Sequence, residues 1–348
     1  MAIDREEDMR MVLAAAAALL LALPGARASA QGSLTVYCSV LADWCQLMAV
    51  EFEKQTGIRT NVSQKGSGET LAQLRAEAAN PRGDVWWGGT GDPHLQAAEL
   101  GLTEAYRSPK LEELLPWARR QAEQSQFRTV GIYAGALGIA YNSELLARKK
   151  LAAPSCWRDL LAPELREEVQ MSNPASSGTA YTAVATFVQL FGEEAGFDYL
   201  KRLHRNVSQY TRSGPAPARN TARGETLFGI MFLHDAVAEA IEGFPVKVVS
   251  PCEGTGYEIG SMSIVKGARN PDAARRWYEF ALTPEAQSLA ARAKSYQTPS
   301  HPRATVPAQA PRLADMKLID YDFAKYGASA ERTRLIARWE KDVASQPR

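Results

Sequence analysis

The sequence predicts an α/β protein built from two lobes, each a mostly parallel sheet with flanking helices. Three observations support this prediction. A strand, a loop and a helix follow one another three times between residues 34 and 101, as in a parallel sheet that is covered by helices. The long apolar segment Val130–Asn142 contains glycines but no turn cluster, so we expect it to run extended from one lobe to the other. Further strands and helices then follow for a second lobe.

The first lobe begins with three predicted strands, each followed by a helix. The strands are expected at 34–38, 58–62 and 84–87, and the helices at 42–55, 69–79 and 94–99. Gly57 and Gly101 come directly after two of these helices, at the position where a glycine commonly ends a helix.

The second lobe and the tail continue the α/β pattern. Strands are expected at 168–171, 207–210, 227–233 and 246–249, helices at 180–191, 197–204 and 237–241, a return strand at 259–265, and tail helices at 271–282, 284–293 and 330–343. We therefore assign the chain to lobe 1 (31–130), lobe 2 (131–257), a return segment of lobe 1 (258–308) and C-terminal helices packing on lobe 2 (309–348). A ligand is expected in the cleft between the lobes, where strands end in loops.

The N-terminus, residues 1–30, has the pattern of a secretory signal peptide. The apolar run 12–23 is followed by an A-x-A motif at Ala28–Ala30, and this run is too short to span a bilayer. Because residues 4–8 are acidic, which is unusual in such a segment, Met9 or Met11 is an alternative start. We expect cleavage near Ala30 to release a soluble periplasmic protein.

The composition excludes several functional classes. A formal net charge of +1, with scattered lysines and arginines, argues against nucleic acid or an anionic membrane as the main partner. The chain has four histidines and no zinc-ligand spacing, nucleophile elbow, P-loop or dinucleotide-binding glycine motif. We therefore expect no catalytic residue, no metal site and no cofactor.

Four cysteines in an exported chain predict two disulfides. Cys38 and Cys45 are seven residues apart, at a strand end and in the following helix, which favours a local bridge. Cys156 and Cys252 then form the second bridge by elimination. The sequence alone leaves all three connectivities open.

Small residues dominate five of the predicted loops: Ser39-Val40, Gly66–Gly68, Gly88–Gly91, Ser176–Thr179 and Ser213-Gly214. Glycines let the backbone approach a ligand, and free N–H groups with hydroxyls at a helix start form an anion site. Several such loops together would hold a phosphate without any arginine. The alternative is ordinary helix capping, which uses the same residue types.

Polar side chains follow the apolar run 227–233. His234 and Asp235 come directly after this predicted strand, and Glu258 lies beyond the next predicted strand. Buried imidazole and carboxylate groups need partners, so these three residues predict a site for the hydroxyl or amino groups of a polar ligand. In the alternative interpretation Asp235 caps the next helix, His234 packs in the core, and Glu258 is a surface carboxylate or part of a structural ion pair.

The chain resembles the periplasmic substrate-binding proteins of ABC importers, in the branch that contains ferric-iron, phosphonate and hexose-phosphate binders. The matching segments are LTVYCSV, AVEFEKQTGI, GSGET, GDVWWGGTGDPHLQAAELGL, GIAYN, NPASSGTAY, FLHD and EGTGYEIGSMSIVKGARNPDAARRWYEFALTPEAQ, spread over most of residues 34 to 290. The resemblance implies a monomeric two-lobed periplasmic binding protein fold (type II) and no enzymatic activity.

The residues after the predicted strand 227–233 indicate which branch of the family the chain resembles. Ferric binders carry adjacent tyrosines where this chain has His234 and Asp235, and it is most similar to the hexose-phosphate type. That resemblance implies that His234, Asp235 and Glu258 contact the sugar. It also implies a set of phosphate contacts: Ser39, Ser67, Gly68, Thr90, Ser176, Ser177, Gly178 and Thr179. The two cysteines of CSVLADWC depart from the family pattern, which leaves the sugar open.

We therefore expect a solute-binding protein that captures a phosphorylated small molecule by lobe closure and delivers it to an ABC importer permease. Within the family, the alternatives are an aminoalkylphosphonate, whose ammonium would face Asp235 and Glu258, and ferric iron. Outside the family, an exported phosphatase or a structural periplasmic protein is the alternative.

Overall fold

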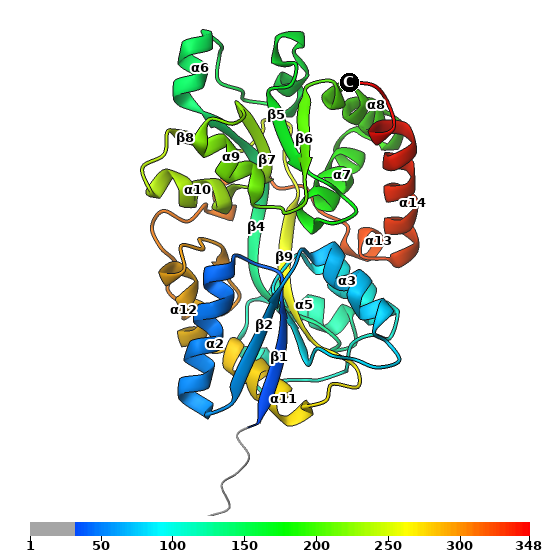
Figure 1. Ribbon diagram of the computed structural model, residues 1–348, viewed down its shortest axis with the longest axis vertical. Coiled ribbons are helices and arrows are strands. Elements are labelled where there is room, and N and C mark those ends of the chain that lie inside the picture. Colours follow the sequence, from blue (N-terminus) through cyan, green and yellow to red (C-terminus); the bar gives the residue numbers. More distant parts are fainter. Residues whose placement is uncertain (1–31) are drawn as a thin grey trace, which may run out of the picture. The chain divides into compact units, whose positions relative to one another are not determined.

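The computed structural model describes residues 32–348, so the predicted signal peptide lies outside the described residues. The strands are β1 (Ser33–Cys38), β2 (Arg59–Gln64), β3 (Val85–Trp87), β4 (Val130–Asn142), β5 (Val169–Ser172), β6 (Val207–Thr211), β7 (Phe228–Phe232), β8 (Val246–Val249), β9 (Tyr257–Ile264) and β10 (Thr298–Pro299). They form two groups of strands joined through β4 and β9, with helices around both groups (Figure 1).

Helices flank the strands in both lobes. They are α2 (Ala42–Thr56), α3 (Ser67–Ala76), α4 (Gly91–Glu99), α5 (Pro116–Gln124), α6 (Ser143–Lys149), α7 (Gly178–Phe191), α8 (Glu193–His204), α9 (Ala216–Arg223), α10 (Leu233–Ile241), α11 (Pro271–Ala281), α12 (Pro284–Arg292), α13 (Phe323–Tyr326) and α14 (Ser329–Trp339). Among residues 32–348, no helix has both the length and the apolar character needed to cross a membrane.

Strand β4 joins the two lobes, as predicted for Val130–Asn142. Its first part pairs with β9 as far as Ala136, and from Leu137 onward it pairs with β7 and β8. All of its residues are buried, because it enters the hydrophobic core of each lobe in turn: Ile132 belongs to one core and Ile139 to the other. One uninterrupted apolar strand therefore connects the lobes.

The strand pairing follows from the connections. The strand order is β2-β1-β3-β9-β4-β7-β5-β6, with β8 and β10 also paired to β4. Strands joined by helices pair in parallel, as β1 does with β2 and β3, and β5 with β6 and β7. Every antiparallel pair involves β4 or β9, because these two strands cross between the lobes in opposite directions.

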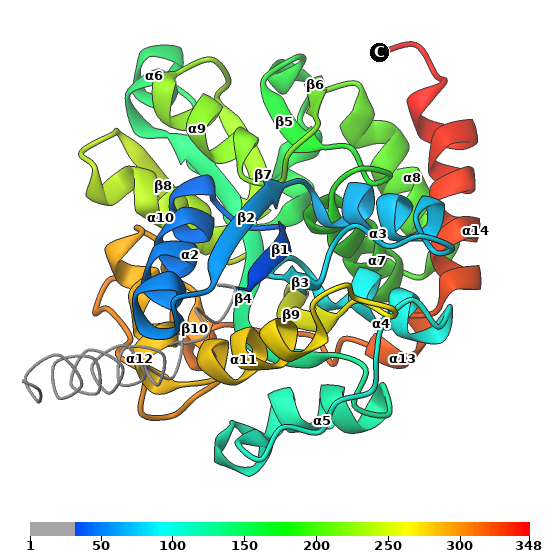
Figure 2. The same cartoon turned by 60° about the horizontal axis from the view of Figure 1, so that its bottom comes forward.

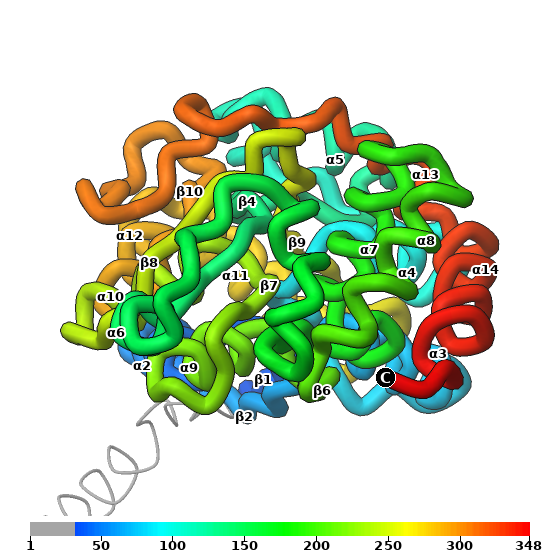
Figure 3. The backbone as a smooth tube through the Cα atoms, turned by 90° about the horizontal axis from the view of Figure 1, so that it is seen from above, coloured from blue at the N-terminus to red at the C-terminus, as the bar shows by residue number. Residues whose placement is uncertain are grey.

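The C-terminal segment returns to lobe 2. The connection between α12 and α13 runs along one edge of the protein (orange to red in Figure 3), and Leu318 forms a parallel bridge with Thr255 beside it. Helix α14 then lies beside α7 and α8 (Figure 2), and its Leu335 and Trp339 are buried in the lobe 2 core. The expected helix over 330–343 is therefore present, at Ser329–Trp339 with a further helical turn to Ala344.

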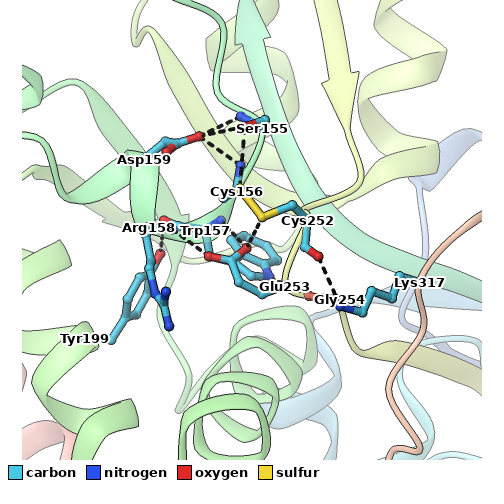
Figure 4. The surroundings of a disulfide bond; sticks show 10 residues. All are labelled: Ser155, Cys156, Trp157, Arg158, Asp159, Tyr199, Cys252, Glu253, Gly254 and Lys317. Atoms are coloured by element: carbon cyan, nitrogen blue, oxygen red, sulfur yellow. Dashed lines mark hydrogen bonds between the residues drawn. A yellow bond between two sulfur atoms is a disulfide. The ribbon is translucent and has the colours of Figure 1, made fainter.

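Both predicted disulfides are present. Cys38–Cys45 ties the end of β1 to α2, and Cys156–Cys252 closes a sequence separation of 96 residues within lobe 2. Figure 4 shows that Glu253, next to the second bridge, accepts hydrogen bonds from the backbone N–H groups of Trp157 (2.8 Å) and Arg158 (3.1 Å). The bridge and these hydrogen bonds anchor the chain just before it enters β9.

Candidate functional site

A cavity lies where the two lobes meet, with about 360 Å³ of empty space that includes the part open to solvent. Ser39, Ser67 and Thr90 of lobe 1 line one side, and Thr179, His234 and Asp235 of lobe 2 line the other, with Glu258 of β9 and Tyr133 of β4 between them. Residues predicted separately from two lobes are thus brought to one place.

Six helices begin at this cavity. Its wall includes the N-cap or a first-turn residue of α2, α3, α4, α7, α9 and α10: Leu41, Ser67, Thr90, Thr179, Pro215 and Phe232. Each helix start presents backbone N–H groups and a partial positive charge, worth about 0.3 to 1 kcal/mol to a nearby anion and up to about 2 when partly buried. The wall is therefore suited to a negatively charged group.

His234, Asp235 and Glu258 form a compact polar group in this cavity, and each is at least nine-tenths buried. The Nε2 atom of His234 lies 3.7 Å from an oxygen of Asp235 and 3.9 Å from an oxygen of Glu258, too far for hydrogen bonds. The Nδ1 atom of His234 has no partner in the described residues. Three polar groups therefore converge without satisfying one another.

The local structure around these residues differs from the prediction in two ways. His234 and Asp235 lie in the first turn of α10, which begins at Leu233 rather than at Val237. Glu258 is the second residue of β9 and does not belong to the end of β8, which stops at Val249. A helix start and a crossing strand therefore bring the three side chains together.

Burial shifts the pKa values of all three groups toward their neutral forms. It lowers the pKa of the His234 imidazole to about 3 and raises the pKa of the Asp235 carboxyl to about 7. Burial, with the nearby charges of Asp235 and Asp92, also raises the pKa of Glu258 well above its ordinary value. A ligand that donates hydrogen bonds or carries a positive charge would favour the ionised carboxylates.

The raised pKa of Asp235 predicts a pH dependence of stability. An acid whose pKa is higher in the folded protein binds more protons there, so the folded state loses stability as pH rises from about 4 to 7. Asp235→Asn removes this loss. We expect the ligand-free variant to be more stable than wild type by about 1 to 2 kcal/mol at pH 8, because lobe opening would relieve only part of the cost. At pH 4 we expect equal stability.

Urea unfolding of both proteins at pH 4, 6 and 8 measures this difference. A variant with the same stability as wild type at pH 8 would show that the Asp235 carboxyl is solvated in the ligand-free protein.

Four of the eight predicted phosphate-end residues line the cavity: Ser39, Ser67, Thr90 and Thr179. The Ser39 hydroxyl accepts a hydrogen bond from the Trp86 indole N–H at 2.9 Å, and the Ser67 hydroxyl accepts one from the Thr90 backbone N–H at 3.2 Å. The Thr90 hydroxyl is buried and has no partner within residues 32–348. These loops hold one another in place and retain hydroxyls for a ligand.

The other four predicted residues, Gly68, Ser176, Ser177 and Gly178, do not line the cavity. Gly68 and Gly178 lie in the first turns of α3 and α7, and the two serines lie just before α7. Ser176 donates its hydroxyl to backbone carbonyls, including that of Arg212 at 3.0 Å. Ser177 is the N-cap of α7 and accepts from the Ala180 N–H at 3.4 Å. The capping alternative is therefore the observed role of Ser177.

The two lobes are closed on each other around the cavity. Gly68 packs against the carbonyl oxygen of Ala175, and Gly178 packs against the Thr90 side chain, where a larger residue would clash. An ion pair joins Glu69 of lobe 1 to Arg212 of lobe 2. The glycines at the starts of α3 and α7 thus permit a close approach of the two lobes.

Two polar side chains of the cavity wall, those of Tyr133 and Gln297, were not predicted from the sequence. Tyr133 accepts a hydrogen bond from the Gly89 backbone N–H at 2.9 Å, and its own O–H proton remains available. Gln297 is buried, and its Oε1 atom has no partner in the part of the chain that the structure describes. Neither lies in a glycine-rich or polar loop motif, so no local sequence signal indicates them.

Gly135 on β4 provides the space that the His234 ring occupies. A Cβ atom at this position would lie 2.6 Å from Cε1 of His234 and even closer to Nδ1. Gly135→Ala is therefore expected to displace the ring and weaken ligand binding by about 10- to 30-fold, since overpacking of this kind costs about 1 to 3 kcal/mol. Calorimetric titration measures the affinity.

A double-mutant cycle tests the cause of this effect. In a His234→Ala background the added methyl group has no ring to displace, so Gly135→Ala should then change affinity by less than twofold. Equal losses with and without His234 would mean that the substitution acts elsewhere on β4.

The chain matches one protein family and is similar to three individual proteins. Residues 91–326 match the family described as bacterial extracellular solute-binding protein. The chain is similar to the periplasmic binding protein AfuA from Actinobacillus pleuropneumoniae, solved with exogenous fructose 6-phosphate bound, with a TM-score of 0.89 and 48% identity over 91% of this chain and 100% of that one. It is similar to the periplasmic binding protein P5PA with a TM-score of 0.87 and 41% identity, over 90% and 99% of the two chains.

The third similar protein is described as binding a phosphonate. A putative 2-aminoethylphosphonate-binding periplasmic protein of Salmonella typhimurium (strain LT2) is 29% identical over 283 residues, which cover 77% of this chain and 79% of that protein. The predicted two-lobed fold and the resemblance to solute-binding proteins of importers are confirmed by these matches.

Proposed function

The chain belongs to the family of bacterial extracellular solute-binding proteins, and on this basis we propose that it captures a sugar phosphate between its lobes and delivers it to the permease of an ABC importer. We propose that it does so as a periplasmic monomer, after cleavage near Ala30. Its strands and lobes are arranged as in AfuA, with which it shares 48% identity. The proposal on the ligand rests on one feature, the pairing of two chemically different groups in one cavity.

The first group is suited to a phosphate. Helix starts surround it, and the hydroxyls of Ser39, Ser67 and Thr90 lie among them. No lysine or arginine lines the cavity within residues 32–348, so backbone N–H groups and hydroxyls would supply the hydrogen bonds. This is a common arrangement for phosphate recognition at helix starts.

The second group is suited to the hydroxyls of a sugar. A neutral His234 imidazole offers one donor and one acceptor, and the carboxyls of Asp235 and Glu258 accept from hydroxyl groups. Tyr133 lies between the two groups. Its hydroxyl accepts a hydrogen bond from the Gly89 N–H on the phosphate side, and the nearby charge of Glu258 helps to raise its pKa. A ligand that reaches both groups bridges the lobes and favours the closed state.

An aminoalkylphosphonate is the second candidate. Two carboxyls next to each other would pair with an ammonium group, and a relative described as a putative 2-aminoethylphosphonate-binding protein is 29% identical. Iron has less support. Ferric binders of this family carry adjacent tyrosines where this chain has His234 and Asp235, and within residues 32–348 Tyr133 is the one tyrosine that lines the cavity.

A set of thermal melts tests the proposal and its rivals. The purified protein is heated alone and with fructose 6-phosphate, 2-aminoethylphosphonate or Fe³⁺, each at 1 mM; at 100 times the Kd a ligand stabilises by about 2.7 kcal/mol. We expect the largest rise in Tm with the sugar phosphate. A rise with Fe³⁺ alone would contradict the proposal, and turnover of a chromogenic phosphate ester would favour a phosphatase.

For the domain organisation we propose one refinement of the predicted boundaries. We place the end of lobe 1 within β4 at Ala136, where pairing changes from β9 to β7 and β8, instead of at residue 130. The return segment 258–308 and the packing of 309–348 on lobe 2 stay part of this proposal without change. This division places Glu258 at the point where the second crossing begins.

A further inference from the structure

Arg332 of α14 is a buried cation in the C-terminal segment, far in sequence from every predicted ligand contact. Only 7% of its surface is exposed. Its guanidinium donates hydrogen bonds to the backbone carbonyls of Pro174 (3.3 Å) and Ala175 (3.1 Å). It also lies 4.7 Å from the centre of the Tyr181 ring. These contacts hold its charge in one place.

No carboxylate neutralises this charge directly. Arg332 forms no ion pair within 4.0 Å in the described residues, and its Nη1 atom has no hydrogen-bond partner there. The charged or titratable groups that influence it are Asp92, Tyr181 and Tyr321. Asp92 accepts a hydrogen bond from the Tyr321 hydroxyl at 2.8 Å, and burial raises the pKa of Asp92 to about 6. A buried guanidinium without a close counter-charge is costly to maintain.

The position of Arg332 relates it to the phosphate side of the cavity. The carbonyls that it binds immediately precede Ser176–Thr179, the loop that starts α7. On the other lobe, a Cβ atom added to Gly68 in the first turn of α3 would lie 2.8 Å from its Nη2 atom. Arg332 thus contacts the segment before α7 and lies next to the start of α3, and the nearby residues Thr179 and Ser67 of these two helices line the cavity.

We propose that Arg332 is a positioning and specificity residue, whose buried charge makes the site select a doubly charged anion over a singly charged one. This proposal rests on the proposed function. Closure brings the positive start of α3 toward the positive guanidinium, and an anion between the loops offsets that repulsion. Because Coulomb attraction is proportional to the ligand's charge, a dianion gains twice as much from Arg332 as a monoanion does.

The experiment compares two esters that differ in charge. Fructose 6-phosphate is mostly a dianion at pH 8, since the second pKa of a phosphate ester is about 6, whereas fructose 6-sulfate is a monoanion of similar shape. Calorimetry gives the ratio of their affinities in wild type and in Arg332→Gln, which keeps a donor for the carbonyls but no charge. We expect the phosphate preference to fall about 10-fold in the variant.

Two controls separate charge from structure. Arg332→Lys keeps the charge but loses the planar donor group, so both affinities should fall while their ratio stays within twofold. Arg212→Gln removes an exposed arginine at the rim of the same cleft and should leave the ratio unchanged.

Four outcomes would overturn the inference. Equal losses of affinity for both esters in Arg332→Gln would show a purely structural role. A fall of the phosphate-to-sulfate affinity ratio in Arg332→Lys would show the same, and this measurement keeps the test decisive if the glutamine variant does not fold. If wild type binds fructose 6-phosphate without preference over the sulfate, the inference fails while the proposed function stands. If wild type binds neither ester, the proposed function fails as well.

Discussion

Replacing Asp235 with alanine is expected to weaken the binding of fructose 6-phosphate by about 30- to 150-fold, or about 2 to 3 kcal/mol. Asp235 is buried between the lobes, next to His234 and near Glu258. In the closed complex a sugar hydroxyl that donated to this carboxylate would lose its partner and have no access to water. Hydrogen bonds to charged groups are worth about 1.5 to 3 kcal/mol, and an unsatisfied buried group adds to the cost.

The same titration with Glu239→Ala serves as the control. Glu239 lies one turn further along α10 and does not line the cavity, so its removal should change affinity by less than threefold. A loss of less than threefold for Asp235→Ala would contradict the assignment of Asp235 to the ligand.

Removing the disulfide Cys156–Cys252 is expected to lower the free energy of unfolding by about 4 to 5 kcal/mol. The bridge closes a loop with a sequence separation of 96 residues, and the chain-entropy model gives about 4.7 kcal/mol for a loop of roughly this length. The anchoring contacts around it, including those of Glu253 to Trp157 and Arg158, depend on the position of the bridged segment (Figure 4).

The second disulfide provides a matched comparison. Cys38 and Cys45 are separated by seven residues, for which the same model gives about 2.5 kcal/mol. Urea unfolding of Cys156→Ser/Cys252→Ser and of Cys38→Ser/Cys45→Ser should therefore show losses that differ by about 2 kcal/mol. Equal losses would mean that packing around each bridge, and not loop closure, determines its contribution.

The fold was predictable where a local pattern specifies the element. Val130–Asn142 is apolar and free of turn residues, and the structure has one strand over the same residues. Helix α9 was missed because its sequence contains prolines at 215 and 217. Both lie at the cap or in the first turn, where proline needs no backbone N–H partner, so the helix tolerates them.

The candidate site was predictable in part, for the same reason. Ser67 and Thr90 lie in glycine-rich segments that predict a helix start, and His234 and Asp235 follow directly after an apolar run. Tyr133 carries no such signal: it lies within the crossing strand, and only the pairing of β4 with β9 brings it to the cavity.

Arg332 is missed for a further reason. It lies in an amphipathic tail helix whose sequence resembles any surface helix, and its burial follows from how α14 packs against α7 near the loop 174–179. The spacing of residues in the sequence does not indicate this tertiary packing.

The most direct test of the proposed function is a calorimetric titration of the protein with fructose 6-phosphate, fructose and inorganic phosphate, each in a separate experiment at pH 8. Because the two polar groups of the cavity would bind opposite ends of one molecule, linking the ends should raise affinity far above that of either part. We expect micromolar or tighter binding of the ester, and binding at least 100-fold weaker for fructose and for phosphate. Equal affinity for phosphate and for the ester, or no binding of the ester, would contradict capture of a sugar phosphate between the lobes.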